Sequence, residues 1–268
     1  MHRLLHYEQM PRQAKQLAEL CACPARDLFN LLPDELKTYY RPTRITTTGY
    51  RRDNTGFIYC KSDTPVCVVA HLDTVYNKPL ALQDIVFIPF VSSDKDGFLQ
   101  SRFIYDRTNI ECHYNYGIGG DDRCGVYHIL ELLRYCKRYN LPYPSILFTD
   151  GEEIGGRGVR NAVKKIYFKE TYFVEIDRRG GDEVVFYGSD SDRHWTRFVC
   201  GTTGFDHMIG SFSDVSVIKN AYPRAKICNL SAGYYNEHQG AYEYICLSSV
   251  RNAQKGLRVL YKVLLEQA

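Results

Sequence analysis

Hydrophobic and polar residues follow a helical period in several parts of the chain. Apolar residues recur at helical spacing over residues 1–40, and the strongest helical pattern covers 124–140, with apolar positions at 126, 129, 130, 133 and 136. A long closing helix is predicted over 246–267. Shorter helices are predicted at 158–167, 190–200 and 213–221.

Short apolar runs alternate with these helices and predict strands. They cover residues 56–60, 65–73, 143–150, 171–177 and 225–233, and residues 84–100 have the pattern of strand, turn and strand. Several runs are almost wholly apolar, which is typical of strands covered on both faces. Because strands that alternate with helices favour a parallel arrangement, we expect an α/β fold, a three-layer α/β/α sandwich around a mixed, mainly parallel sheet.

Three of the predicted strands end in polar residues. His71 and Asp73 end the run VVAHLD, Glu152 and Glu153 follow ILFTD, and Asp177 ends YFVEID. In open α/β sheets, ligands bind beyond the carboxyl ends of the strands. We therefore expect these side chains to share one edge of the sheet.

Two of the polar motifs also have a structural explanation when each is taken alone. His71 and Asp73 point the same way on a strand, so the carboxylate can fix the imidazole of a metal ligand, but a hydrogen-bonded histidine at a strand end is the more common case. The adjacent Asp121 and Asp122 follow a glycine-rich turn and repel each other unless a cation or solvent lies between them. One aspartate alone would also fit a helix N-cap there.

The remaining candidates are two adjacent glutamates, an aspartate and a loop histidine. Glu152 and Glu153 can divide the roles of metal ligand and proton acceptor from a metal-bound water, and the alternative is a solvated acidic turn. Asp177 ends its strand, and Glu175 two residues earlier is a rival ligand on the same side. His238 lies in the loop before the closing helix, where a lone histidine is usually only solvated.

Together the candidates run in the order His, Asp, Glu, Asp, His along the chain. Mixed imidazole and carboxylate ligation suits Zn²⁺ and related divalent ions, with Co and Mn as alternatives. Two metals about 3.5–4 Å apart need a carboxylate to bridge them. Five ligands with one shared would give each of two divalent ions three protein ligands and leave room for a hydroxide between them.

From about residue 65 to the C-terminus, the sequence resembles the co-catalytic di-zinc exopeptidase superfamily. The resemblance rests on the motifs AHLDTV, GGDDRCGV, FTDGEEIGGRG, FVEID and NEHQGAYEYI. The superfamily includes leucyl and glutamyl aminopeptidases, peptidase T-like tripeptidases, carboxypeptidase G-like enzymes and acyl-amino-acid deacylases. The resemblance implies a zinc-exopeptidase-like fold, two bound metal ions, and a small peptide or acyl-amino-acid substrate.

The same resemblance implies a ligand set for each metal. The first metal would be held by His71, Asp121 and Asp177. The second would be held by Asp121, Glu153 and His238, so that Asp121 is the bridging carboxylate.

Two further roles and one backbone feature follow from the resemblance. Asp73 would orient His71 without binding the metal itself. Glu152 would take a proton from the bridging water and pass it to the leaving amine. In many members a cis peptide follows the bridging aspartate, which makes Asp121–Asp122 the candidate here.

The domain organisation departs from that of many relatives. They insert a second domain either between the first histidine and the bridging aspartate or between the fourth and fifth ligands, where this chain has only about 50 and about 60 residues. We therefore expect residues 1–268 to form a single catalytic domain, closer in build to the single-domain leucyl aminopeptidases, whereas the motifs GGDDRCGV and EEIGGRG are more similar to those of glutamyl aminopeptidases and tripeptidases. Residues 1–55 would be a helical N-terminal extension of unknown role.

The function expected from these observations is that of a metal-dependent exopeptidase acting on small peptides, most simply an aminopeptidase. An N-acyl-amino-acid deacylase on the same site is the first alternative. A catalytically inactive binding module on the same fold is the second, and a single-metal acyltransferase of the glutaminyl cyclase type is the third.

Several residues near the motifs are candidates for contacts with the substrate. Tyr234 or Tyr235 could donate a hydrogen bond to the oxyanion, although packing explains these tyrosines as well. The glycine- and serine-rich segment 201–218 could form a substrate wall with His207 and Asp214, or only a connecting loop. Three arginines beside proposed ligands could bind a substrate carboxylate or balance the acidic site: Arg157, Arg178 and Arg179.

The composition of the chain limits which binding partners and which cellular compartment we expect. The chain of 268 residues has a formal net charge of +3, which does not suggest the concentrated basic face of a nucleic-acid or membrane-surface protein. No run approaches the roughly 20 apolar residues of a membrane span, and residues 1–16 lack the features of a signal peptide. Ten scattered cysteines without a secretion signal favour reduced thiols and a cytoplasmic protein. Whether the chain forms a homo-oligomer stays open.

Overall fold

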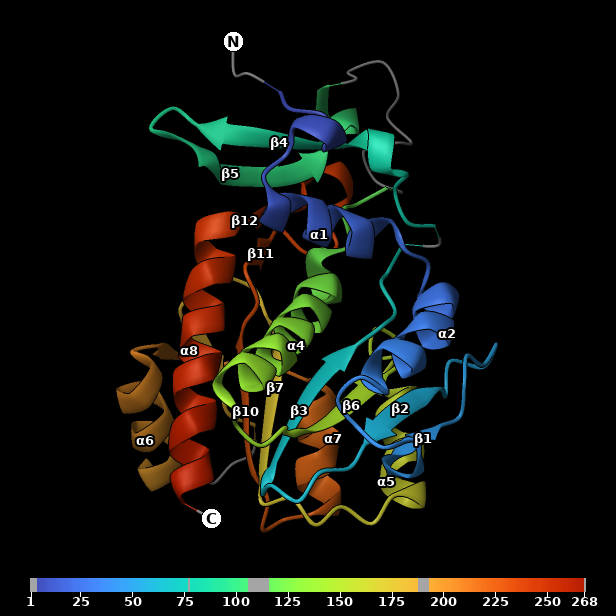
Figure 1. Cartoon of the computed structure of the whole chain (residues 1–268), viewed down its shortest axis with the longest axis vertical. Coiled ribbons are helices and arrows are strands. Elements are labelled where there is room, and N and C mark those ends of the chain that lie inside the picture. The colour runs from blue at the N-terminus through green and yellow to red at the C-terminus, as the bar shows by residue number, and fades with distance from the viewer. Residues whose placement is uncertain (1–3, 77, 106–115, 188–192, 268) are drawn as a thin grey trace.

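The largest element of the fold is an eight-stranded sheet (Figure 1). The computed structural model describes residues 4–76, 78–105, 116–187 and 193–267. The strands of this sheet are β1 (Ile45–Thr47), β2 (Phe57–Cys60), β3 (Val66–His71), β6 (Ser145–Thr149), β7 (Tyr172–Arg178), β8 (Glu183–Val185), β9 (Asp206–Met208) and β10 (Lys226–Ser231). They lie in the order β1-β2-β6-β3-β7-β10-β8-β9.

The central strands of the main sheet are parallel. Strand β3 pairs in parallel with β6 on one side and with β7 on the other, and β7 pairs in parallel with β10. Strands β8 and β9 are also parallel, whereas β1–β2, β2–β6 and β8–β10 are antiparallel pairs. The sheet is therefore mixed and mainly parallel, which confirms the prediction.

Helices cover both faces of the main sheet. They are α1 (Arg12–Ala22), α2 (Ala25–Leu36), α4 (Gly120–Tyr139), α5 (Arg157–Lys165), α6 (Arg193–Thr203), α7 (Asp214–Ala221) and α8 (Leu247–Glu266). In Figure 1, α4 and α8 lie in front of the sheet, and α5 and α7 lie behind it. The three-layer α/β/α arrangement is therefore confirmed. Residues 190–192, which were predicted to begin the helix α6, lie outside the described residues.

Strand β3 shows why its sequence has to be apolar throughout. Val66, Val68 and Ala70 belong to the core beneath α4 and α8, whereas Cys67 and Val69 belong to the core beneath α5 and α7. Successive side chains on a strand point to opposite faces. Because helices cover both faces here, each position must be apolar until the strand reaches its polar end.

Helix α4 begins with an irregular backbone. Gly119 precedes it with φ +68°, a conformation that favours glycine, and a Cβ at Gly120 would lie 2.7 Å from Cβ of Tyr234. The peptide bond between Asp121 and Asp122 is cis, which confirms the prediction, and neither aspartate has helical φ and ψ angles. The irregular start places both carboxylates at the carboxyl-end edge of the sheet.

A second, four-stranded antiparallel sheet lies at the upper end of the molecule in Figure 1. Its strands are β4 (Ile85–Phe90), β5 (Ser93–Ser101), β11 (Tyr234–Tyr235) and β12 (Tyr244–Cys246), in the order β11-β12-β5-β4. The sequence predicted the hairpin of β4 and β5 but not the two short strands. Strands β11 and β12 flank the segment that contains His238, so this small sheet helps to place the last motif.

The N-terminal residues pack onto the rest of the fold. Helix α1 contacts α4, and α2 contacts β2, with Leu17 and Phe29 buried in the same core as the main sheet. The helical prediction for this region is confirmed at α1 and α2, while β1 was not predicted. The N-terminal extension is therefore part of the wall that covers the front of the sheet.

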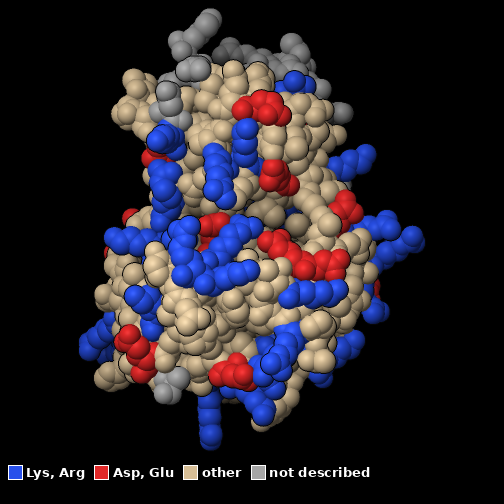
Figure 2. All heavy atoms as spheres, in the orientation of Figure 1, with Lys and Arg blue, Asp and Glu red and all other residues tan. Residues whose placement is uncertain are grey.

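The face formed by α4 and α8 has acidic side chains beside its basic ones (Figure 2). Arg134 of α4 pairs with Glu131, and Arg251 of α8 pairs with Asp96 on β5. Within the described residues, no helix has a stretch long and apolar enough to cross a membrane. The nine cysteines of the described residues are free thiols, and Cys112 lies outside these residues.

Candidate metal centre

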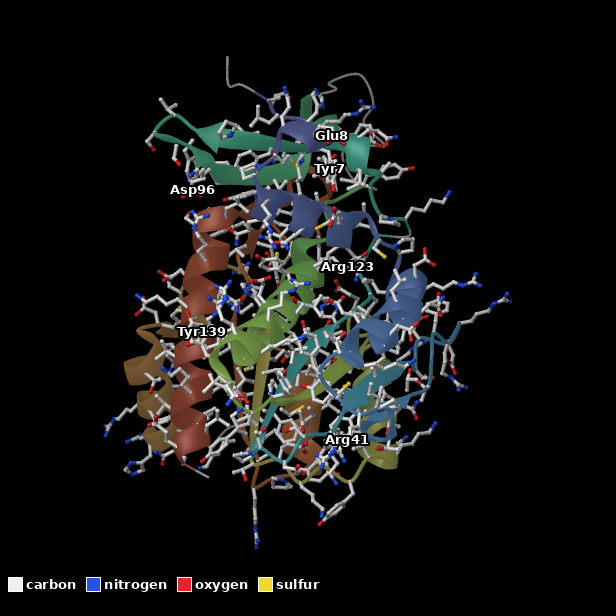
Figure 3. The ribbon with its side chains drawn as sticks, viewed as in Figure 1. Tyr7, Glu8, Arg41, Asp96, Arg123 and Tyr139 are labelled. Carbon is white, nitrogen blue, oxygen red and sulfur yellow. The ribbon has the colours of Figure 1, made fainter. Side chains whose placement is uncertain are left out.

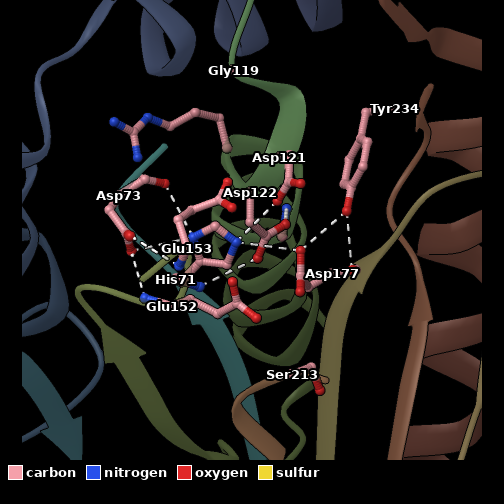
Figure 4. A network of polar contacts seen from close by, with 12 residues as sticks. His71, Asp73, Gly119, Asp121, Asp122, Glu152, Glu153, Asp177, Ser213 and Tyr234 are labelled. Carbon is pink, nitrogen blue, oxygen red and sulfur yellow. Dashed lines mark hydrogen bonds and ion pairs between the residues drawn. The ribbon is translucent and has the colours of Figure 1, made fainter. Parts of the chain in front are cut away.

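The candidate site lies at the carboxyl ends of three neighbouring strands. His71 is the last residue of β3, Asp177 lies near the end of β7, and Glu152 and Glu153 follow β6. Because these strands are adjacent and parallel, their ends lie at one edge of the sheet. Asp121, at the start of α4, faces the same space (Figure 4). The sequence prediction of a shared edge is therefore confirmed.

The two histidines face opposite oxygens of Asp121. Nε2 of His71 lies 3.0 Å from Oδ1 of Asp121 and 3.4 Å from Oδ1 of Asp177. Nε2 of His238 lies 3.3 Å from Oδ2 of Asp121 and 3.0 Å from Oε2 of Glu153. Nε2 of each histidine thus lies near Asp121 and one further carboxylate, and the two groups share Asp121.

Asp73 connects His71 to the loop of the two glutamates. Its Oδ1 lies 3.4 Å from Nδ1 of His71, and that nitrogen lies 3.1 Å from the Asp73 carbonyl oxygen. The two carboxylate oxygens accept hydrogen bonds from the backbone N–H groups of Glu152 at 3.2 Å and Glu153 at 3.3 Å. One buried carboxylate therefore fixes both the imidazole and the backbone of the adjacent glutamates.

Asp122 lies beside the cluster and stabilises its backbone. Its oxygens accept hydrogen bonds from the N–H groups of His71, at 3.3 Å, and Gly125, at 2.8 Å. Potential ligand atoms of His71, Asp122 and Asp177 lie within 4.8 Å of one another, as do those of His71, Asp121 and Glu153. Asp122 is thus near enough to ligate, but its carboxylate already holds the end of β3 against the start of α4.

The electrostatics of the cluster are dominated by buried negative charge. Burial raises the pKa of Glu152 to about 10 and the pKa of Asp177 to about 7. Burial also opposes the charge of Asp121, but hydrogen bonds from the two histidines hold its pKa below the usual range. The contacts of His238 with Asp121 and Glu153 raise its pKa to about 11. So many carboxylates in one buried space favour positive charge between them.

The donor set fits divalent metal ions. It offers two imidazole nitrogens and several carboxylate oxygens, which is the mixture that Zn²⁺ and related ions prefer. A carboxylate with one oxygen toward each histidine has the arrangement of a bridging ligand. A bound cation would also relieve the repulsion among the buried carboxylates.

Glu175, the rival ligand, has a different partner. Its carboxylate accepts hydrogen bonds from the Ser213 hydroxyl and from the N–H groups of Asp214, at 3.2 Å, and Val215, at 3.3 Å. These groups form the N-terminus of α7, whose unpaired N–H groups and dipole favour a negative charge. Glu175 therefore anchors α7 to β7, and within the described residues it is in neither group of potential ligands.

Of the two candidate tyrosines, only Tyr234 reaches the cluster. Its buried hydroxyl lies 3.0 Å from the carbonyl oxygen and 3.1 Å from Oδ1 of Asp177 (Figure 4). The hydroxyl of Tyr235 lies 2.7 Å from Oγ of Ser249, and its ring stacks on Tyr244. Tyr235 thus packs against α8 and β12.

The arginines beside the proposed ligands already have protein partners. Arg178 pairs with Glu183 at 2.8 Å, Arg179 pairs with Glu237 at 3.0 Å, and Arg157 donates a hydrogen bond to the Asp53 carbonyl at 3.4 Å. A substrate carboxylate would have to compete with these contacts. Their role in substrate binding stays a prediction.

The segment 201–218 is divided between the interior and the surface. Asp214 is buried and accepts a hydrogen bond from the Thr149 hydroxyl, so it faces the sheet. His207 is exposed on β9 and lines a cavity of about 520 Å³ together with Arg160. The two residues therefore do not form one common wall.

Sequence reasoning missed Arg123 and Glu243. Arg123, near the start of α4 (Figure 3), is 2% exposed and donates hydrogen bonds to the carbonyls of Leu72 and, at 3.1 Å, Cys23. Glu243 is fully buried and accepts hydrogen bonds from the backbone beside Asp121. An acidic residue inside the otherwise apolar and aromatic run AYEYI was the available signal for Glu243.

The N-terminal extension also borders the site. A cavity of about 270 Å³ is lined by Asp73 and Gly119 from the motifs and by Cys21 and Tyr50 from the extension. This placement had no signal in the sequence, because it depends on contacts between residues far apart in the chain.

Known proteins resemble the chain in structure rather than in sequence. No protein-family model and no curated protein sequence matches it. A tripeptidase from Staphylococcus aureus superimposes with a TM-score of 0.68 at 13% identity, covering 96% of this chain and 100% of the tripeptidase. A TET aminopeptidase from a marine-sediment archaeon of the Thaumarchaeota gives 0.63 at 11% identity, with 95% and 99% covered. The aminopeptidase PepT of Bacillus cereus gives 0.61 at 13% identity, with 96% and 99% covered.

The chain has the fold of these peptidases. Identities this low establish the fold and leave the chemistry to be argued from the residues of the site. The zinc-exopeptidase-like fold expected from the sequence motifs is therefore confirmed.

Proposed function

We propose that the protein is a two-metal hydrolase that removes residues from the ends of small peptides, most simply as an aminopeptidase. The observation that carries this proposal is the position of Asp121, whose two oxygens face His71 and His238 at 3.0 Å and 3.3 Å. The likeness in fold to a tripeptidase and to two aminopeptidases supports peptides as the substrate.

Two sets of residues would hold the ions. His71, Asp121 and Asp177 would hold the first, and Asp121, Glu153 and His238 would hold the second. Zinc suits these ligands, and Co²⁺ or Mn²⁺ suits them as well. Bound ions of this kind lower the pKa of a shared water and polarise the carbonyl group of the substrate.

Glu152 acts as the general base in this proposal. It lies on the loop after β6, and the carboxylate of Asp73 holds its backbone N–H. Bound cations would oppose the raised pKa of this carboxyl group and keep it ionised, so that it can accept a proton from the attacking water and then pass it to the nitrogen of the leaving amine. Asp73 also keeps the imidazole of His71 in one orientation, which leaves Nε2 directed at Asp121 and Asp177.

Hydrolysis assays with matched peptides test the proposal. The zinc-, cobalt- and manganese-loaded protein is given a tripeptide with a free amino group, the same peptide with its amino group acetylated, and N-acetyl amino acids. We expect hydrolysis of the free tripeptide and its loss when a chelator removes the metal. Turnover of the N-acylated compounds alone would instead identify a deacylase, and less than one metal per chain after zinc exposure would identify a binding module.

The variant Glu152→Gln tests the general base. It should lower kcat by about 10²–10⁴-fold while the chain binds as much zinc as before, because the carboxylate moves a proton and does not ligate. The matched control is Glu131→Gln on the surface of α4, which should keep full activity. A Glu152→Gln variant with wild-type kcat contradicts the assigned role.

A further inference from the structure

Glu243 joins the start of α4 to the segment that contains His238. It lies five residues after His238 and is fully buried. Its carboxylate accepts hydrogen bonds from the backbone N–H groups of Gly119, at 3.1 Å, and Asp121, at 3.2 Å. The residue therefore holds the backbone of Asp121 through its N–H group, without contributing to the candidate ligand groups of the described residues.

Tyr76 extends this connection to the loop after β3. Its hydroxyl accepts a hydrogen bond from the N–H of Gly240 at 3.0 Å and donates one to the carboxylate of Glu243. Its ring packs against Gly117, where a Cβ would overlap the ring. Tyr76 thus connects the backbone two residues after His238 to the glycine-rich turn before α4.

The loop of His238 needs such support. His238 has φ +63°, a left-handed conformation that is unfavourable for non-glycine residues and persists only where neighbouring groups fix it. Its side chain is 49% exposed, so packing restrains it less than the fully buried His71. Hydrogen bonds at Gly240 and Asp121 are therefore well placed to set the distance between the His238 and Asp121 side chains.

We propose that Glu243 and Tyr76 are positioning residues that hold His238 and Asp121 at the separation needed to bind the second ion. The inference rests on the proposed function, because it assumes that the site binds two metals. Partners that orient ligands typically change metal affinity by about 10–100-fold when they are substituted. The effect should fall on the ion held by Glu153 and His238, since the ion at His71 and Asp177 is positioned by the strands.

Zinc titration against a coloured chelator measures both affinities. The wild-type chain should bind two zinc ions. Glu243→Gln should lower the affinity for the second ion by at least tenfold and the affinity for the first by less than threefold. The amide oxygen can accept a hydrogen bond from only one of the two N–H groups, and its own NH₂ group then faces the other. Tyr76→Phe should weaken the second ion in the same way but less, because it removes only the hydroxyl.

The matched control is Glu237→Gln. Glu237 is next to His238 but pairs with Arg179 at the surface. Both zinc affinities of the Glu237→Gln variant should therefore stay within twofold of the wild-type values. The inference is overturned if Glu243→Gln lowers the affinity for both ions equally, or lowers neither affinity. If Glu243→Gln fails to fold, as judged by circular dichroism, Tyr76→Phe decides the question by the same criterion.

Peptide hydrolysis is measured separately so that the two proposals can fail independently. If the second ion is selectively weakened but the wild-type chain hydrolyses no peptide, the positioning role is supported and the peptidase function is wrong. If peptides are hydrolysed but both ions respond equally, the function stands and the positioning role is wrong.

Discussion

The two histidines of the candidate metal centre are supported in different ways. His71 ends the central strand β3, has a parallel strand on each side, and has no exposed side-chain surface. His238 lies in a loop with a left-handed backbone and a half-exposed side chain. The sheet itself positions the first histidine, whereas the second depends on side chains such as Glu243 from other segments. Stability and metal binding should therefore respond differently to changes at each histidine.

The variants His71→Ala and His238→Ala give the largest expected effects. Each should lower kcat by more than about 10³-fold, because each removes a ligand of the proposed two-ion centre. His71→Ala should also leave less than one zinc bound and destabilise the metal-free fold by about 2–4 kcal/mol, since it opens a buried cavity beside carboxylates. His238→Ala should keep one zinc and lose less than about 1 kcal/mol, as exposed charge pairs do.

Zinc titration and urea unfolding in the presence of a chelator check this pair of variants. Equal losses of stability in the two variants would contradict the distinction between a sheet-supported and a loop-supported histidine.

Substitution of Arg123 tests the sheet-supported side more closely. Arg123→Met should lower the free energy of unfolding by about 3 kcal/mol, because the carbonyls of Leu72 and Cys23 lose a donor and the nearby buried acids lose a cation. Leu72 follows His71 directly, so the affinity for the first zinc ion should fall more than the affinity for the second. Urea unfolding and zinc titration measure the two effects.

A surface arginine on the same helix supplies the control for Arg123. Arg134→Met breaks an exposed pair with Glu131 and should cost less than about 1 kcal/mol. A similar loss in both variants would show that the buried contacts of Arg123 contribute little.

A smaller, pH-dependent effect is expected from His128, which ties α4 to the end of β10. Its ring nitrogens contact the side chain of Gln254 and, at 2.9 Å, the carbonyl of Ala232. Burial lowers its pKa below the ordinary value of 6.5. Just below pH 6.5, His128 is therefore protonated in the unfolded chain but still neutral in the folded chain. Stability should therefore fall as the pH drops below about 6.5, by at most about 1.4 kcal/mol per pH unit from this group.

The variant His128→Gln isolates this contribution. Urea unfolding at pH 8 and at pH 5.5 should show a shallower pH dependence in the variant than in the wild type, with the other titrating groups common to both. Identical pH dependence would mean that His128 is protonated in the folded chain as well.

Much of the fold and the positions of the candidate ligands followed from local patterns. The apolar runs ending at His71 and Asp177 predicted two central strands, and parallel strands bring their ends to one edge. The pairs Asp121–Asp122 and Glu152–Glu153 were noticed because each pair of adjacent acids lies beside glycines, and the resemblance to zinc exopeptidases implied which member of each pair would ligate. Such signals lie within a few residues of one another and need no knowledge of tertiary contacts.

The supports of the site could not be read from the sequence in the same way. Glu243 and Asp121 are 122 positions apart in the chain, and Arg123 and its partner Cys23 are 100 positions apart. Strands of two or three residues, such as β8, β9 and β11, are also too short to show a period of two. Both kinds of feature exist only once tertiary contacts have formed.

The spread of the proposed ligands along the chain sets the order in which the centre can assemble. His71 is made early during synthesis, but its partners follow at positions 121, 153 and 177, and His238 comes only just before α8. A ribosome-bound chain that has not yet exposed this last loop has one complete group of ligands and only part of the other. If the chain binds two ions as proposed, the second would therefore be captured late, after the central strands have joined.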